Sequence, residues 1–545
     1  MVIEVSNIKK LVIKGLKVFK NFEIEFNDDA NIIIGDNESG KSTIIEAIDI
    51  VLNKKYYNYD KYIISDLLNK ENVNLFEEKK EYELLPKIEI FAILNLDNNC
   101  KNNFDFFGDH GVNTNIEEYG IKFICQFDER FKNELLPVIN EGKIPFEYYE
   151  MNWETFKGEP YNSLKKPFKY LSIDNSKIDN INSFNYYNRT LFNNKFDELQ
   201  RMKFKNDFRT KINELINDIG IDKIDDNRNF GIDNKKVILE NILSVFEEKI
   251  PIENRGKGKE NLIKTDIALS KASNDVEVIT IEEPENHLSH LNLRKMLDNI
   301  KNSFKDKDGN KRNIQLIVTT HNSLIVSSLN ITNILWINNN DRPKNLKELS
   351  KTEEGKKVSL FFEKADNLNL LQFLISDKVI LVEGATEYML VQKMFRDIYN
   401  GETLEKNKID VISCDGVSYK NYLTIAESMN KRVAVLTDND FKTNENKLND
   451  IIEYNKNLKN AKIFTDEKTE NWTWEVSLYN LNKDILEENI KLKKGANYLV
   501  DGEDFGKYLG KMLNNKTEMA YMIIEKNLCL TYPDYIKECF EWIKE

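Results

Sequence analysis

The sequence predicts an α/β protein with at least two domains, and three patterns carry this prediction. Within residues 32–42 an apolar run leads directly into G-x-x-x-x-G-K-S, and apolar residues at helical spacing follow it. Two further apolar strands, at 276–281 and 314–318, lead into acidic residues and a histidine. In the last third, apolar strands at 378–382 and 432–436 also end in acids. Short buried strands that alternate with helices indicate an α/β architecture in both parts of the chain.

Length and composition set the broad class. The chain has 545 residues, 41% of them hydrophobic, which is enough for two or three buried cores. Its formal net charge of -13 argues against a general electrostatic grip on nucleic acid and leaves a local basic patch open. The five cysteines form no C-x-x-C pair, so we expect reduced thiols and neither zinc nor disulfides. Without a signal segment or an 18-residue apolar run, we expect a soluble, cytoplasmic protein with no membrane partner.

The G-x-x-x-x-G-K-S run predicts a cradle for the phosphates of ATP. Glycines allow backbone N–H groups to turn toward phosphate oxygens, Lys41 can reach the β- and γ-phosphates, and the Ser42 hydroxyl can bind Mg²⁺. The helix that follows adds its N-terminal dipole. The alternative is a glycine-rich turn that binds nothing. The residues expected to hold the nucleotide here are Gly35, Asn37, Gly40, Lys41, Ser42 and Thr43.

The strand at 276–281 ends in Glu282-Glu283-Pro284, which is typical of a Walker B segment. We expect Glu282 to hold the metal and Glu283 to orient or deprotonate the attacking water. An ordinary polar turn at the end of a strand is the alternative. The next buried strand delivers His321, and a lone histidine in such a place is more often structural.

These motifs, in this order, resemble those of the ABC and SMC class of ATPases, and the resemblance spans residues 1 to about 345. It implies that His321 is the switch histidine that contacts the γ-phosphate. In that class a glycine-containing signature of one subunit touches the nucleotide of the other. The usual L-S-G-G-Q is missing, and Gly256 and Gly258 in R-G-K-G-K-E are the candidate substitute. This departure favours ATP as a sensor or dimer clamp over vigorous hydrolysis.

A second group of acids follows the two strands of the last third. Glu383 and Glu387 stand four residues apart, after the strand at 378–382 and at the start of a predicted helix. Asp438 and Asp440 form D-x-D after the strand at 432–436. Carboxylates gathered at strand ends repel one another unless a divalent metal holds them. E-G and D-x-D also occur in ordinary turns, so the order of both on two buried strands carries the prediction. Alternation along a strand would direct Asp438 and Asp440 to the same side.

Together these patterns resemble a Toprim domain, which supports metal-dependent cutting or joining of nucleic acid strands. The resemblance implies that Glu383 is a general acid/base or a metal ligand, and that Glu387, Asp438 and Asp440 are ligands of Mg²⁺ or Mn²⁺. It also implies that Glu475 in N-W-T-W-E-V serves a second metal and that Lys516 stabilises the transition state. For these last two residues the alternative is a solvated surface charge.

An ABC-type ATPase followed by a Toprim domain resembles the OLD (overcoming lysogenisation defect) family of endonucleases, which includes nucleases of Gabija antiphage systems. The resemblance implies an ATP-binding, nucleotide-gated, Mg²⁺- or Mn²⁺-dependent DNA endonuclease that acts in defence as a homo-oligomer, with a helicase or other partner protein possible. The expected parts are residues 1–184 and 251–362 for the ATPase, 185–250 for a helical dimerisation insertion, and 363–545 for the Toprim domain.

Two other functions stay open at this point. A RecF- or SMC-like repair or recombination ATPase would use the Toprim-like domain to bind DNA without cutting it, and loss of the catalytic acids would favour that function. The acids are present here. A primase or topoisomerase is a weaker alternative, because neither a zinc module nor a domain with a nucleophilic tyrosine is evident and the ATPase half would be unexplained.

Overall fold

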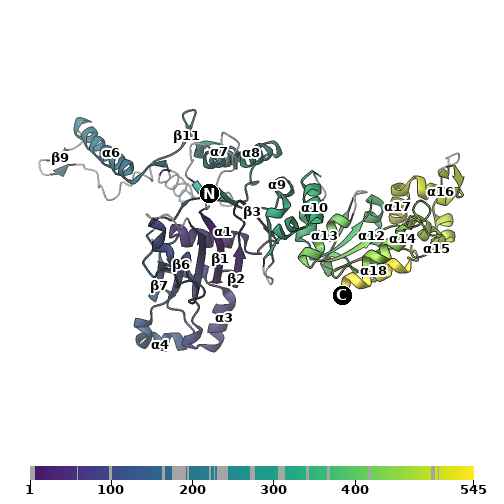
Figure 1. Cartoon of the computed structure of the whole chain (residues 1–545), viewed down its shortest axis with the longest axis horizontal. Coiled ribbons are helices and arrows are strands. Elements are labelled where there is room, and N and C mark those ends of the chain that lie inside the picture. Colours follow the sequence, from purple (N-terminus) through teal and green to yellow (C-terminus); the bar gives the residue numbers. More distant parts are fainter. Residues whose placement is uncertain are drawn as a thin grey trace. The chain divides into compact units, whose positions relative to one another are not determined.

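The structure is a computed structural model, and it divides into two compact units (Figure 1). The first comprises Met1–Leu329 and Asn333–Lys344, and the second comprises Asn330–Thr332 and Asn345–Glu545. The residues that it describes are 6–57, 59–96, 101–162, 166–174, 192, 195–219, 223–225, 228–229, 243–269, 276–304, 314–338, 343–364, 369–414, 419–492, 498–500 and 502–545. No helix in these ranges has the length and the apolar character needed to cross a membrane.

An antiparallel sheet forms one layer of the first unit. Its strands follow the order β2-β1-β4-β6-β5, and β7 also pairs with β6. Branched and aromatic residues form β1 and β2, and alternating apolar residues form β4 and β6. The bounds are β1 (Asn7–Leu16), β2 (Phe19–Glu25), β4 (Ile88–Asn95), β5 (Phe107–Gly108), β6 (Glu118–Phe127) and β7 (Tyr149–Thr155).

A second sheet, of order β16-β15-β3-β14-β13-β8, carries the nucleotide motifs. Its pairs β15·β3, β3·β14, β14·β13 and β13·β8 are parallel. Parallel strands end at one edge of a sheet, so the loops that follow β3, β13 and β14 meet there. The bounds are β3 (Ala30–Gly35), β8 (Lys169–Asp174), β13 (Val276–Glu282), β14 (Gln315–Thr319), β15 (Ile334–Ile337) and β16 (Lys344–Asn345).

The phosphate-loop helix α1 (Lys41–Asn53) lies between the two sheets and is buried along nearly its whole length. It packs against β4 and β6 of the antiparallel sheet and against β3 and β13 of the parallel one. Two side chains also hold the last turn of α1 by hydrogen bonds. Trp153 Nε1 donates to the Ile50 carbonyl and the Tyr161 hydroxyl donates to the Leu52 carbonyl, each at 2.8 Å. The unit's other helices are α2 (Ile64–Leu67), α3 (Lys70–Lys79), α4 (Lys132–Asn140), α7 (Lys257–Leu269), α8 (His290–Ser303) and α9 (Ser323–Ser328).

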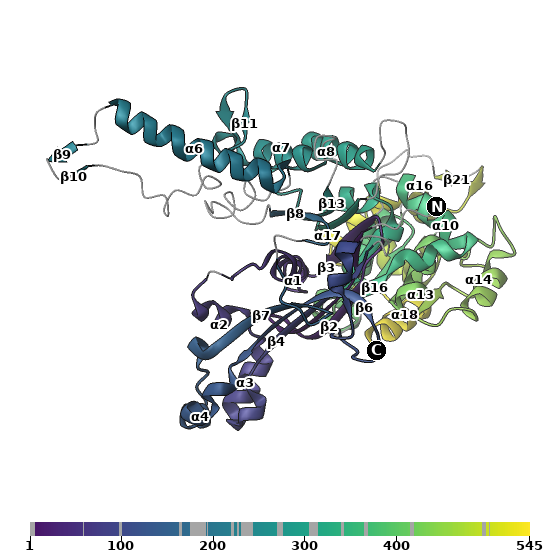
Figure 2. The same cartoon turned by 60° about the vertical axis from the view of Figure 1, so that its left-hand side comes forward.

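The predicted insertion contains one long helix, α6 (Glu198–Ile219), followed by the short strands β9 (Lys223–Asp225) and β10 (Arg228–Asn229) (Figure 2). Much of the range 185–250 lies outside the described residues. Its C-terminal end is not helical, because β11 (Phe246–Glu247) and β12 (Ile250–Pro251) form an antiparallel pair. Glu248 and Lys249 between them have positive φ angles of 50° and 67°, which a two-residue hairpin turn requires and a helix does not allow.

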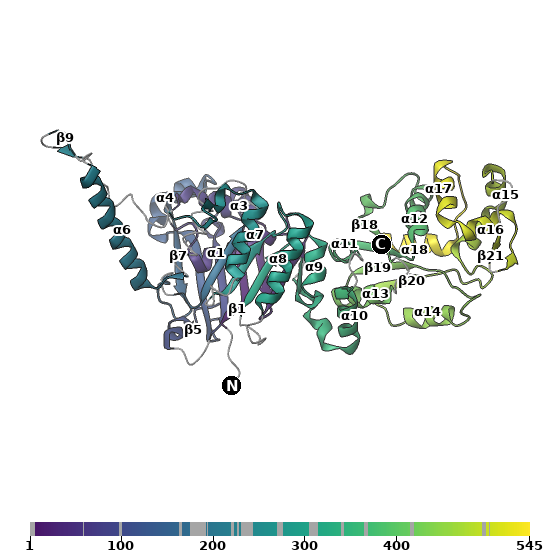
Figure 3. The same cartoon turned by 90° about the horizontal axis from the view of Figure 1, so that it is seen from above.

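The second unit is built on a parallel sheet of order β18-β17-β19-β20. Helices cover both faces of this sheet (Figure 3). Ile380 and Val382 of β17 belong to the buried cluster that includes residues of α12 and α18. Strand alternation directs Val379 and Leu381 to the opposite face, where α13 packs. The strands are β17 (Lys378–Val382), β18 (Ile409–Ser413), β19 (Arg432–Leu436) and β20 (Ala461–Phe464), with a separate pair β21 (Leu499–Val500) and β22 (Glu503–Asp504).

Helices surround this sheet. They are α10 (Glu353–Lys364), α11 (Leu370–Ile375), α12 (Ala385–Ile398), α13 (Lys420–Met429), α14 (Lys447–Asn455), α15 (Trp474–Asn489), α16 (Lys507–Asn514), α17 (Lys516–Glu525) and α18 (Asp534–Lys544). The sequence placed α10 in the ATPase, but it belongs to the second unit. Phe362 of α10 packs edge-on against Tyr422 of α13, with ring centroids 5.0 Å apart, so this helix completes the second core.

Gln315 joins the two sheets of the first unit. Its Oε1 accepts from the Ile8 N–H at 3.0 Å, and its Nε2 donates to the carbonyls of Ile8 and Asn27 at 2.8 and 2.9 Å. The register of β1 against β4 shifts between Ile8 and Lys10, and Gln315 bonds both backbone polar groups of Ile8 at this irregularity. The side chain is fully buried, so no water can replace these bonds.

We expect Gln315→Leu to lower the free energy of unfolding of the first unit by ~3 kcal/mol, because three buried backbone groups lose their partner. Urea denaturation of the full chain, followed by Trp fluorescence and circular dichroism, measures this change. Gln315→Glu is the comparison, since it keeps the acceptor and the length. A loss under ~1 kcal/mol for Gln315→Leu would show that the bridge between the sheets is not needed.

Candidate active sites

The loop between β3 and α1 has the form of a phosphate cradle. Gly40 has φ 97°, and a Cβ atom there would meet the ring of Phe19 at 2.3 Å, so this position requires glycine. Lys41 Nζ folds back onto the loop and donates to the carbonyls of Gly35 and Asp36, at 3.0 and 2.7 Å. Asn37 and Ser42 are exposed, while Thr43 is buried in the first turn of α1. The ammonium and the N-terminus of α1 therefore meet at one point.

The acids after β13 and the histidine after β14 lie beside this lysine. Burial lowers the pKa of Lys41, and the carboxylates of Glu283, Asp36 and Glu282 oppose that effect, which places them around its ammonium. His321 Nε2 is 4.0 Å from Glu283 Oε1. Burial and the Lys41 charge lower the pKa of His321, so its imidazole is neutral at pH 7. The structure brings together the lysine, both acids and the histidine that the sequence singled out.

Hydrogen bonds fix the two strand ends relative to each other. Glu283 has a left-handed backbone, φ 44°, and its N–H donates to the Thr319 carbonyl at 3.0 Å. Glu285 Oε1 accepts from the Thr320 hydroxyl at 2.8 Å and from the His321 N–H at 2.7 Å. Glu285 was not among the predicted site residues, although it directly follows the E-E-P motif. It ties the loop of the acids to the loop of the histidine.

A polar cavity of about 310 Å³ is lined by Ser42 and Glu282, the two residues expected to hold Mg²⁺. Lys17, Glu46 and Lys55 also line it, and Glu46 forms ion pairs with both lysines. Its size is at the lower end of the range of small-molecule sites. The cradle therefore adjoins a hollow large enough for part of a nucleotide.

The candidate signature glycines lie at the start of α7. Gly256 directly precedes this helix and Gly258 is in its first turn. A Cβ atom at Gly258 would lie 2.2 Å from the His287 carbonyl oxygen, so the helix packs closely on the loop that follows the acids. At Gly256 nothing lies within 4 Å of such an atom, so this backbone is open.

In the second unit, the predicted acids follow the adjacent parallel strands β17 and β19. The chain leaves β17 for β18 on one side and returns to β19 on the other, so the strand order reverses between these two strands. Ligands of α/β sheets bind at this switch point, outside the carboxyl ends of the strands. Glu383 directly follows β17, and Asp438 follows β19 after one residue. The fold therefore places both carboxylates at the standard ligand position.

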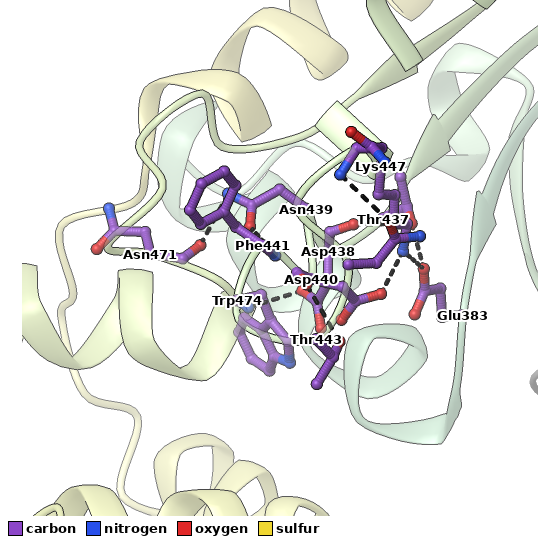
Figure 4. A network of polar contacts seen from close by, with 12 residues as sticks. Glu383, Thr437, Asp438, Asn439, Asp440, Phe441, Thr443, Lys447, Asn471 and Trp474 are labelled. Carbon is purple, nitrogen blue, oxygen red and sulfur yellow. Dashed lines mark hydrogen bonds and ion pairs between the residues drawn. The ribbon is translucent and has the colours of Figure 1, made fainter. Parts of the chain in front are cut away.

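A threonine and a lysine hold Glu383 and Asp440 (Figure 4). The Thr437 hydroxyl donates to Glu383 Oε1. Lys447 Nζ, at the start of α14, lies 3.4 Å from Glu383 Oε1 and also pairs with Asp440 Oδ2. Asp440 has φ 46°, and the strand already ended at Leu436, so strand alternation does not relate it to Asp438. The two aspartates contact different partners.

Asp438 points into the buried end of the site. Its Oδ1 accepts from the Trp474 N–H at 2.7 Å, at the first residue of α15 (Figure 4). Burial, with the nearby charges of Glu475 and Glu383, raises the pKa of Asp438 well above its usual value. Burial and the Glu475 charge likewise raise the pKa of Glu387. These carboxylates lie close enough to repel one another when ionised. Binding of a cation or a proton would reduce this repulsion.

Glu475 and Lys516 complete the cluster. Glu475 is 1% exposed, neither of its carboxylate oxygens has a hydrogen bond of good geometry, and Lys516 Nζ lies 2.8 Å from Oε1 as an ion pair. Burial alone would lower the pKa of Lys516. The charges of Glu475 and Asp438 outweigh the effect of burial, so the pKa of Lys516 is raised. Glu475 is therefore not a solvated surface charge, which was the alternative for both residues, while Lys516 has a side chain that is 41% exposed and paired with a buried acid.

The residues fit a divalent cation. Buried Glu475 Oε2, which has no hydrogen-bond partner among the described residues, and the raised pKa of Asp438 are what a hard, oxygen-binding ion would relieve. As they stand, no three Asp, Glu, His or Cys side chains among the described residues lie close enough together to hold a metal ion, so a bound cation requires these side chains to move. Instead, Lys447 and Lys516 compensate the acids. Glu387 Oε2 accepts from the Gly384 N–H at 3.1 Å, so this acid also caps α12.

Lys447 is the residue of this site that sequence reasoning missed. It lies seven positions after Asp440, at the start of a helix, in a lysine-rich segment where nothing separates it from solvated lysines. Only the fold shows that it lies between two acids from different loops.

Comparison with known proteins finds domains of the same two kinds. Residues 7–326 match the family profile of the AAA ATPase domain. The chain belongs to this ATPase family. Residues 374–440, which include Glu383, Asp438 and Asp440, match the profile "Overcoming lysogenization defect protein-like, TOPRIM domain". The OLD-like Toprim match thus ends at the second aspartate of D-x-D.

Two relatives align with this AAA ATPase–Toprim chain over most of their own length. Endonuclease GajA of Bacillus cereus (strain HuB5-5) is 24% identical over 618 residues, which cover 96% of this chain and 87% of the relative. An "ATP/GTP phosphatase" of Helicobacter pylori (strain ATCC 700392 / 26695) is 23% identical and covers 66% and 99%. Together with the two profiles, the match to Endonuclease GajA confirms the resemblance expected from the sequence, an ATPase followed by an OLD-like Toprim domain.

Solved structures were also matched. The Smc head domain of Pyrococcus furiosus is 15% identical and covers 65% of this chain and 100% of its own, with a TM-score of 0.34. The C-terminal region of the Xanthomonas campestris pv. campestris OLD protein is 22% identical and covers 31% and 95%, with a TM-score of 0.22.

We expect Lys41→Ala to weaken ATP binding at least tenfold, because it removes a charged donor from the phosphate cradle. Titration of the full chain with a fluorescent ATP analogue measures the dissociation constant. Lys20→Ala, at an exposed lysine of the same unit, is the matched control. Unchanged affinity for ATP in Lys41→Ala would overturn the phosphate-loop assignment.

We expect Lys447→Met to tighten Mn²⁺ binding roughly threefold to tenfold, since it removes a positive charge from Glu383 and Asp440, an effect of ~1 kcal/mol. Calorimetric titration with Mn²⁺, without DNA, measures it. Lys456→Met, at the exposed opposite end of α14, is the control. Weaker Mn²⁺ binding in Lys447→Met would instead show that the lysine shapes the site.

Proposed function

We propose that this chain is an ATP-binding DNA endonuclease that hydrolyses phosphodiester bonds at the carboxyl edge of its Toprim sheet. The observation that carries the proposal is the convergence of buried Glu475 and Asp438 with Lys516, beside Glu383 and Glu387, in a site that needs a cation. The alignment with Endonuclease GajA along nearly the whole chain supports the same activity.

The residues divide the work of hydrolysis. Asp438, Glu475, Glu387, Glu383 and Asp440 would hold Mg²⁺ or Mn²⁺, which supplies an activated water and neutralises charge on the phosphate when bound. Glu383, held by the Thr437 hydroxyl, is placed to accept the proton of the attacking water. Lys516 carries a fixed positive charge whose pKa the acids raise, and it stabilises the negative charge that grows on the phosphate oxygens.

The ATPase unit gives nucleotide control. Lys41, Ser42 and Thr43 would bind the phosphates and the Mg²⁺ of ATP, with Glu282 holding that metal through water. Glu283 and neutral His321, 4.0 Å apart, are placed to orient water and to contact the γ-phosphate. Because the L-S-G-G-Q signature is absent and Gly256 and Gly258 stand in its place, ATP acts as a sensor or a dimer clamp that gates the nuclease.

We infer that the insertion forms the contact between copies of this chain, and four exposed apolar side chains of α6 support this inference. Monomeric proteins rarely leave large apolar side chains this exposed on one helix. Those of α6 are Leu199 (80%), Met202 (58%), Phe204 (47%) and Leu215 (58%). The chain therefore forms a homo-oligomer through this helix. By the resemblance to Gabija nucleases, the setting is cytoplasmic antiphage defence, and a helicase is the partner to look for.

We expect Asp438→Ala to abolish metal-dependent nicking and linearisation of supercoiled plasmid, by at least ~10³-fold, or roughly 4 kcal/mol in the barrier. The assay uses the full chain in Mg²⁺ or Mn²⁺, with and without ATP, and gives the sign of nucleotide control. Asp450→Ala, at an exposed aspartate of α14, is the matched control.

Two results would contradict the proposal. Cleavage that persists in Asp438→Ala would move the chemistry away from the Toprim site. DNA binding with no cleavage by the wild type in either metal, with and without ATP, would favour a repair or recombination ATPase whose Toprim domain only binds DNA.

A further inference from the structure

Two aromatic rings and a lysine gather beside the carboxylate cluster of the second unit. The rings of Trp472 and Phe505 have centroids 5.5 Å apart and are tilted by 50°. Lys442 Nζ lies over both, 5.2 Å from the Trp472 centroid and 4.4 Å from that of Phe505, and it pairs with Glu503. We call Trp472, Phe505 and Lys442 the aromatic platform. Its residues come from three separate loops, and none has a role in the chemistry described above.

The platform is fixed to the catalytic loop through the backbone. The Asp440 N–H donates to the Trp472 carbonyl at 3.0 Å, and the Trp474 N–H donates to Asp438 Oδ1 at 2.7 Å. Asn439, between the two aspartates, donates from Nδ2 to the Asp466 carbonyl at 2.7 Å, at the start of the loop that leads to Trp472. A ligand on the platform is therefore held at a set distance from the carboxylates, next to the phosphate that they would cleave.

The chemistry of the platform matches a nucleotide. Trp472 and Phe505 are partly exposed, and Lys442 is exposed. Aromatic faces stack on nucleobases without regard to sequence, and the ammonium that lies over these rings can pair with the neighbouring phosphate once a base takes its place. Both faces of a base inside a duplex are already covered by its neighbours. Only a base that has left the stack can lie on such a platform.

We propose that the aromatic platform binds an unpaired nucleobase of the DNA strand next to the cleavage site. The inference rests on the proposed nuclease function and makes it more specific: the substrate is DNA with a single-stranded, bulged or extruded nucleotide at the site. Lys442 moves from Glu503 toward a backbone phosphate of that strand when the base stacks. Fully paired duplex binds without this contact.

The test is binding without metal, so that no cleavage takes place. The full chain is titrated with three fluorescein-labelled DNAs of one sequence: a single strand, a paired duplex and a duplex with one bulged adenine. Trp472→Ala should weaken binding to the single strand and the bulged duplex by about fivefold to a hundredfold, and binding to the paired duplex by less than about twofold. Trp472→Tyr should retain most of the affinity because it keeps an aromatic face.

A matched control lies at the opposite edge of the same sheet. Arg432, the first residue of β19, sits over the ring of Trp542 with its guanidinium carbon 4.2 Å from the centroid. Trp542→Ala thus also removes a tryptophan that lies under a cation, but away from the carboxylates. It should leave all three affinities unchanged, and circular dichroism of both alanine variants verifies that they fold.

Each other outcome overturns the inference. Equal binding of bulged DNA by wild type and Trp472→Ala would show that no base stacks there, and plasmid cleavage would then still support the nuclease. An equal loss on all three DNAs would indicate a purely structural role for Trp472. If the wild type binds none of the DNAs and cuts no plasmid, the nuclease function falls together with the platform.

Discussion

Compensation of gathered carboxylates by lysines is the interaction on which both sites depend. In the first unit Lys41 lies among Glu282, Glu283 and Asp36, and in the second Lys447 and Lys516 lie among acids from three different segments. Burial makes each uncompensated charge costly, so these lysines stabilise the gathered acids while no ligand is bound. The same arrangement makes the sites responsive, because an incoming metal or phosphate competes directly with a contact that stabilises the ligand-free protein.

Parallel sheets explain why so much of both sites was predictable from the sequence. Each motif follows a short apolar strand, and parallel strands bring their carboxyl ends to one edge, so linear order gives spatial proximity. The cradle at Lys41, the acids at Glu282 and Glu283, and the acids after β17 and β19 were predicted on that basis. What failed had no such pattern: Lys447 looks like any surface lysine, and a two-residue turn at Glu248 and Lys249 interrupts an apparently helical stretch. The predicted boundary at residue 362 also differs from the one in the structure. In the sequence α10 follows the ATPase strands, but it packs on α13 of the second unit.

Glu387 shows how one residue serves both folding and chemistry. Its carboxylate caps α12 through the Gly384 N–H, which is a sufficient structural reason for a glutamate at this position. Burial, and to a smaller extent the neighbouring charge of Glu475, nevertheless raise its pKa above the usual value, so the cap is made by an acid that is under electrostatic stress. A cation at the site would relieve that stress without breaking the cap, since the second carboxylate oxygen remains available. Structural and metal-binding roles therefore do not compete here.

Nucleotide gating needs an element whose two arrangements ATP can distinguish, because a ligand shifts an equilibrium only by its difference in affinity between states. In the proposed function, the loops after β13 and β14 of the first unit would form such an element. Glu285 ties them together through the Thr320 hydroxyl and the His321 N–H, while His321 and Glu283, 4.0 Å apart, would face the γ-phosphate. A phosphate that draws His321 toward it pulls directly on the group that Glu285 holds. The loss of the γ-phosphate would return the histidine to Glu283, so the state of the nucleotide is expressed first in the position of one short loop.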